Sequence, residues 1–139
     1  MSEDQPISML DVNLADRQAL KVLPDNEECQ VRIARASVVP VKSDPDRIQL
    51  ALVLDVPNDP LVDDIYEWIA LPNAAAKAED LKRYTKNINR LAEFCDAFGI
   101  SMPIQTEALL GREGWVVLRE GEGQDGSPQN RVRRFVVRR

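Results

Sequence analysis

The chain has 139 residues, of which 44% are hydrophobic and 29% are charged, and these values suit a single globular domain with a core of its own. No apolar run approaches the roughly 18 residues of a membrane-spanning helix, and the first ten residues, MSEDQPISML, lack the basic and apolar regions of a signal peptide. We therefore expect a cytoplasmic protein without a membrane partner. Two widely spaced cysteines and the absence of histidine argue against a disulfide framework and remove the commonest general base and metal ligand.

The formal net charge of −5 is concentrated at one end of the chain. Residues 1–28 hold seven acids and two bases, whereas residues 29–139 hold 16 of each and are neutral. Within this neutral part, residues 131–139 contain five arginines and no acid. We therefore expect an acidic, partly ordered N-terminal arm over residues 1–28 and a folded domain over residues 29–139.

Three strands are predicted in the first half of the domain. In residues 29–39, Val31 and Ile33 share one face, and residues 40–46, which contain two prolines, are expected to form a loop. Residues 47–56 show the clearest period of two, on the face formed by Ile48, Leu50, Leu52, Leu54 and Val56. In residues 65–71, Tyr66 and Trp68 lie on one face, opposite Ile65, Ile69 and Leu71.

A helix is predicted over residues 74–98, between the capping residue Asn73 and Gly99, a typical residue after a helix end. Apolar residues three and four apart form one stripe to pack on the sheet: Leu81, Tyr84, Ile88, Leu91, Cys95 and Phe98. A short helical turn is expected at residues 106–111. Two more strands, over residues 115–120 and 130–137, flank the turn GEGQDGSP.

The predicted fold is mainly β with one inserted helix. Five short strands in the order β-β-β-α-β-β match the element order of an OB-like barrel, in which the helix covers one end. An open α+β sheet has the same order of elements and stays as the alternative.

The sequence contains no recognisable catalytic constellation. The segments GREG and GEGQDG match neither a Walker motif nor a dinucleotide fingerprint. A cysteine nucleophile would need a base, and histidine is absent. We expect no enzyme activity, no cofactor and no metal site.

Aromatic and arginine side chains on the predicted strands indicate binding of single-stranded nucleic acid, because rings stack on bases of any sequence and guanidinium groups contact phosphates. The candidate residues are Tyr66, Trp68, Trp115, Arg32, Arg35, Arg119, Arg131, Arg133, Arg134 and Phe135. Two alternatives stay open. Trp115 and Phe135 can belong to the core, and the arginines can protect a strand edge from aggregation.

Several segments resemble a family of small phage-encoded proteins of formerly unknown function. The run GREGWVVL followed by QNRVRRFV resembles the C-terminal half of that family, and IYEWIALP and EFCDAFGI are similar to two of its other segments. The similarity covers most of residues 23–137. The chain departs from the pattern at PDNEEC, which has no glycine and has Cys29 where the family carries an aromatic residue.

The resemblance implies an OB-like fold and a single-stranded DNA-binding protein of phage replication or recombination, located in the host cytoplasm. Replication or recombination proteins that contact the acidic arm, and a homo-oligomer, with a dimer as the first choice, are the partners expected beside DNA. The alternative function is a non-catalytic interaction module whose terminal strand pairs with another subunit or partner.

Overall fold

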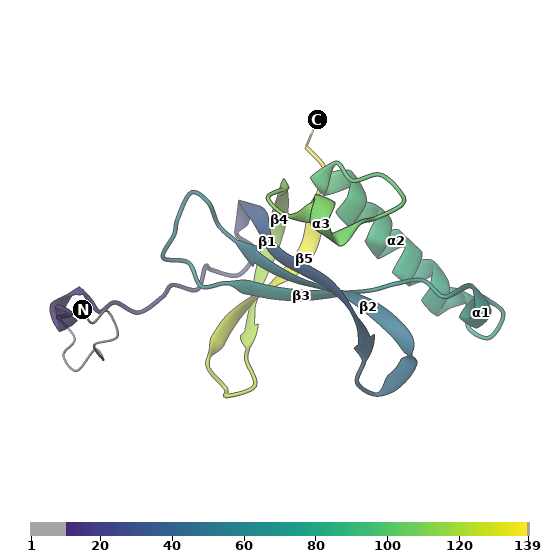
Figure 1. Ribbon diagram of the computed structural model, residues 1–139, viewed down its shortest axis with the longest axis horizontal. Helices are drawn as coiled ribbons and strands as arrows, with labels where there is room; N and C mark the ends of the chain where they lie inside the picture. The colour runs from purple at the N-terminus through teal and green to yellow at the C-terminus, as the bar shows by residue number, and fades with distance from the viewer. Residues whose placement is uncertain (1–10, 139) are drawn as a thin grey trace, which may run out of the picture.

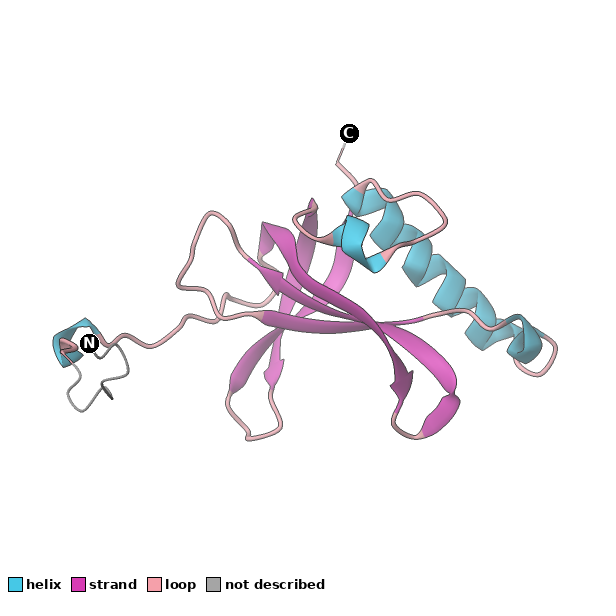
Figure 2. Cartoon of the chain, in the orientation of Figure 1, coloured by secondary structure: helices cyan, strands magenta, loops and turns pink. Residues whose placement is uncertain are grey.

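The computed structural model describes residues 11–138 and places a helical segment between the third and fourth of five strands, as the sequence predicts (Figures 1 and 2). The first ten residues of the predicted arm lie outside this range. The elements are a 3-10 turn at Leu14–Asp16, β1 (Glu28–Val41), β2 (Asp44–Asp55), β3 (Ile65–Ala70), α1 (Ala74–Lys77), α2 (Leu81–Phe98), α3 (Thr106–Leu109), β4 (Glu113–Glu122) and β5 (Pro128–Val136). None of the helices in residues 11–138 is long and apolar enough to cross a membrane.

The five strands form one antiparallel sheet in the order β3-β2-β1-β4-β5. The long strand β1 is central because its first half pairs with β4 and its second half pairs with β2. A bulge between Ile33 and Arg35 lies just past Arg32, the last residue of β1 that pairs with β4, and bulges increase the local twist of a sheet. The sheet curls until the two outer strands, β3 and β5, contact each other. Over the described range no backbone ladder joins them, so the sheet is open.

The inner face of the sheet carries the predicted core. Alternate residues of β1, β2 and β3 are buried as their period of two requires: Val31, Ile33, Leu50, Leu52, Leu54, Ile65 and Ile69. The C-terminal half of α2 packs on this face through Phe94 and Phe98, whose rings lie 5.5 and 6.1 Å from the ring of Phe135 on β5. Figure 2 shows α3 beside this end of α2.

The prediction of one helix over residues 74–98 is confirmed at its start, where Asn73 accepts a hydrogen bond from the N–H of Ala75 at 2.9 Å, but it is wrong about continuity. Asp80 interrupts it and caps a new helix, because its side chain accepts a hydrogen bond from the backbone N–H of Arg83 at 3.0 Å. The end is confirmed: Gly99 adopts a left-handed conformation with φ of 67°. The predicted apolar stripe packs only in its second half. Leu81 and Ile88 are exposed because α2 extends past the sheet at its N-terminal end (Figure 1).

The predicted loop at residues 40–46 is also wrong, because most of it belongs to the β1–β2 hairpin. Only Lys42 and Ser43 remain between the two strands. Pro40 is tolerated in β1 because this part of the strand has a neighbour on one side only. The β1–β2 and β4–β5 hairpins project from the same side of the molecule (Figure 1).

Residues 21–28 of the predicted arm are ordered and form hydrogen bonds with the folded domain. The side chain of Asn130, which is buried, accepts a hydrogen bond from the N–H of Leu23 at 2.8 Å and donates one to its carbonyl at 2.9 Å. Lys21 forms a parallel bridge with Val62. Residues 11–20 are exposed and extend away from the sheet (Figure 1).

Candidate nucleic-acid interface

Two aromatic rings lie exposed on β3. The strand alternates strictly, so Ile65, Glu67 and Ile69 face inward while Tyr66 and Trp68 face outward. Tyr66 is 36% exposed and Trp68 is 43% exposed. Large aromatic side chains are usually buried to a greater extent, so an exposed pair on one strand face is a candidate contact surface.

The two rings border an apolar groove of about 470 Å³ on the outer face of β1, β2 and β3. The small side chains of Ala34 and Ala51 lie along it, and Arg35 is its charged residue. Because these alanines are short, the groove stays open between the rings and the neighbouring strands. A flat, apolar ligand that carries negative charge suits this lining.

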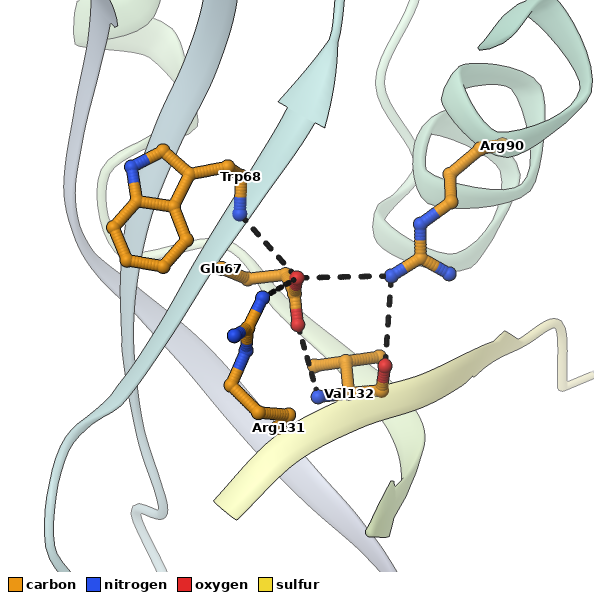
Figure 3. Close-up of polar contacts among 5 residues, drawn as sticks. All are labelled: Glu67, Trp68, Arg90, Arg131 and Val132. Atoms are coloured by element: carbon orange, nitrogen blue, oxygen red, sulfur yellow. Dashed lines mark hydrogen bonds and ion pairs between the residues drawn. The ribbon is translucent and has the colours of Figure 1, made fainter. Parts of the chain in front are cut away.

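Arg131 connects the aromatic pair on β3 with the arginines of β5. Its guanidinium carbon lies 5.3 Å from the centre of the Trp68 ring, within the range of a cation–π interaction. Its Nη2 atom donates a hydrogen bond to Oε1 of Glu67 at 3.0 Å (Figure 3). The curl of the sheet therefore brings residues of its two outer strands into one site.

Glu67 is a residue that the sequence reasoning missed. It is only 4% exposed, although a carboxylate is rarely buried without partners. The backbone N–H of Val132 donates to its Oε2 at 2.9 Å, and Nη2 of Arg90 lies 3.9 Å from its Oε1 (Figure 3). The signal was present in the pattern, since Glu67 occupies the inward position between Ile65 and Ile69.

Arg133 and Arg134 are both exposed because a bulge opposite Val117 and Leu118 keeps them outside the core. Arg133 is already paired, at 3.2 Å from both carboxylate oxygens of Asp25. A hydrogen bond from the N–H of Glu120, together with Arg133, lowers the pKa of Asp25 below its ordinary value. Within residues 11–138, Arg134 forms no ion pair.

Three further candidates lie outside the groove. Arg32 donates two hydrogen bonds to Asp55, at 3.1 and 2.9 Å. Arg119 lies opposite Arg131 in the β4–β5 ladder. Trp115 is half-buried, and the guanidinium carbon of Arg138 lies 3.5 Å from its ring centre. The structure therefore does not bring these three side chains together with Tyr66 and Trp68.

The expectation that Phe135 stacks on bases is wrong. Its side chain is 5% exposed and packs between α2 and the sheet, against Phe94 and Phe98. The guanidinium of Arg90 covers it at 4.9 Å. The inward position on β5 decides its role, and the core alternative is confirmed for this residue.

The two thiols are poor nucleophiles. Partial burial, and then the charges of Glu27 and Glu28, raise the pKa of Cys29 to about 11, and burial also raises the pKa of Cys95. Because the thiolate is the reactive form, both side chains stay protonated at neutral pH. In the described part of the chain, no group of three or more cysteine or acidic side chains is placed to hold a metal ion.

No protein-family model matches the sequence, and no curated protein matches it.

Proposed function

We propose that the protein binds single-stranded DNA, largely without regard to base sequence, and acts in phage-type DNA replication or recombination. The observation that carries the proposal is the exposure of Tyr66 and Trp68 in one groove, with Arg131 of β5 against the Trp68 ring. Aromatic rings that accept any base and arginines that follow the backbone are the two components that such binding needs.

In this proposal the rings stack on bases, and the exposed cations contact phosphates. Arg35 in the groove and Arg134 on β5 are the candidates for phosphate contact, because neither forms an ion pair within residues 11–138. The lining of the groove is mainly apolar and aromatic, which agrees with binding that tolerates sequence.

We further propose that the sheet is a barrel of the OB type. The order β3-β2-β1-β4-β5, with the outer strands in contact, supports this assignment, since OB-folds are partly open five-stranded barrels. Glu67 spans the remaining gap, because its carboxylate accepts the hydrogen bond of the Val132 N–H in place of a backbone carbonyl. Contact of replication proteins with residues 1–28, a homodimer and a place in the host cytoplasm belong to the same proposal.

The alternative of partner pairing through the terminal strand finds less support. Strand addition needs free backbone groups at the outer edge of β5. At Val132 the N–H is bonded to Glu67, and the carbonyl accepts from Nη2 of Arg90 at 3.5 Å. Side chains thus already occupy both groups at the middle of this edge.

Replacement of Trp68 by alanine tests the proposal. Loss of one stacked base costs about 1–3 kcal/mol, which is about a 5- to 150-fold weaker affinity for labelled oligo-dT in a fluorescence-anisotropy titration. Tyr84→Ala is the matched control, because Tyr84 is a half-buried aromatic residue of α2 that lines a different hollow. Equal affinities of the folded Trp68→Ala and Tyr84→Ala variants would contradict the proposal.

A further inference from the structure

We propose that Glu67 is the positioning residue of a one-sided base-stacking site. It holds the guanidinium of Arg131 against one face of Trp68, so that the ring offers its opposite face to a nucleobase. This inference rests on the proposed function and adds the device that orients the site. It also assigns to Arg131 a role that differs from phosphate contact.

The geometry of Glu67 suits a fixed support. The side chain is almost fully buried, and a backbone N–H that belongs to β5 itself donates to its Oε2. The second oxygen accepts from Arg131 at 3.0 Å, while Arg90 of α2 approaches the same atom at 3.9 Å (Figure 3). Three groups from two elements, β5 and α2, therefore hold the carboxylate, and the guanidinium that it binds has little freedom to leave the ring.

Arg131 is poorly placed to bind phosphate in addition. The carboxylate of Glu67 balances its charge at hydrogen-bond distance. Its Nε–H is buried and has no acceptor in the described part of the chain, so this donor is not directed outward. A cation over one face of an indole leaves the other face for a planar partner. The exposed fraction of Trp68, 43%, agrees with a ring that is covered on one side only.

Glu67→Gln is the appropriate perturbation, measured in a Trp115→Phe background so that Trp68 is the only tryptophan. Glutamine has the same shape and keeps an oxygen for the Val132 N–H, but it loses the charge that holds Arg131. We expect acrylamide to quench Trp68 fluorescence more strongly, because the second ring face opens. We also expect the affinity for oligo-dT to fall about two- to fivefold, as the loss of an exposed cation–π interaction predicts.

Asp55→Asn is the matched control, because it also removes a carboxylate that pairs with an arginine on this sheet, here Arg32 outside the groove. This variant should leave both the quenching of Trp68 and the affinity unchanged. Equal quenching in the Glu67→Gln and parent proteins, or an equal shift in the control, would overturn the inference.

A salt titration separates positioning from phosphate contact. Arg131→Gln should weaken binding without changing the slope of log affinity against log salt, whereas removal of a side chain that neutralises one phosphate of a single strand reduces that slope by about 0.7. A slope that falls by this amount would overturn the inference. The double variant Glu67→Gln/Arg131→Gln should lose no more affinity than Arg131→Gln alone, because Glu67 acts through Arg131. Decreases in affinity that add up in the double variant would also overturn the inference.

The two proposals fail in different ways. If the parent protein does not bind oligo-dT at low salt, the proposed function is wrong, and the proposed base-stacking site is then wrong as well. If the parent binds while Glu67→Gln retains the same affinity and quenching, only the positioning role is wrong. If Glu67→Gln fails to fold, as seen by circular dichroism, Arg131→Gln and its salt slope decide the question.

Discussion

Gly114 tests how tightly β4 packs on helix α2. A Cβ atom added at this glycine would lie 2.9 Å from the backbone oxygen of Ala97 and 2.9 and 3.0 Å from two ring carbons of Phe98. The carbonyl belongs to the last turn of the helix, and the ring is buried between Phe94 and Phe135. Neither neighbour can move without disturbing the core, so Gly114→Ala should strain it.

The magnitude follows from two opposing effects. Overpacking of a core costs about 1–3 kcal/mol, while loss of glycine flexibility in the unfolded chain returns about 0.4–1 kcal/mol. Taken at the middle of each range, the expected net loss of stability is about 1.3 kcal/mol. For a domain of this size, that lowers Tm by about 4–5 °C.

Gly121 on the same strand is the matched control. Its added Cβ would meet only the flexible end of Arg119, at 3.3 Å, with the next atom at 3.8 Å. Gly121→Ala should therefore keep or slightly raise Tm in a thermal melt followed by circular dichroism. Equal Tm values for the two alanine variants would refute the close packing of β4 on α2.

Two further predictions concern charge and thiol chemistry. Arg134→Gln should flatten the salt dependence of oligo-dT binding, so that the affinity ratio between about 50 and 200 mM salt shrinks about 2.5-fold. Arg133→Gln should change the salt dependence less, because Asp25 already pairs with Arg133. A larger change for Arg133→Gln than for Arg134→Gln would contradict the assignment of Arg134 to phosphate contact. With a pKa of about 11, Cys29 should react with iodoacetamide at pH 8 at least about tenfold more slowly in the native than in the urea-unfolded protein. Peptide mapping of the labelled protein measures this rate, and equal rates in both states would count against the burial of the thiol.

Local patterns predicted most of the elements because they depend on neighbours in sequence. The period of two in β2 and β3 assigned the correct residues to each face, including the outward placement of Tyr66 and Trp68. The helix end at Gly99 followed from the preference of glycine for positive φ. These features need no knowledge of the rest of the chain.

Features that depend on distant segments could not be predicted. Arg131 and Glu67 are 64 residues apart, and only the curl of the sheet brings them together. The extension of β1 through Pro40 depends on the absence of a second neighbouring strand at that point. Phe135 and Trp68 have similar aromatic character in the sequence, yet inward and outward positions on their strands give them opposite roles.

The most direct test of the central claim is the fluorescence of Trp68 in the Trp115→Phe variant during titration with oligo-dT at low and moderate salt. If bases stack on the exposed ring, the emission should be quenched to saturation, and the apparent affinity should fall as salt rises, because phosphate contacts release counterions. Emission that does not change at low salt, or binding that leaves Trp68 unquenched, would contradict the account.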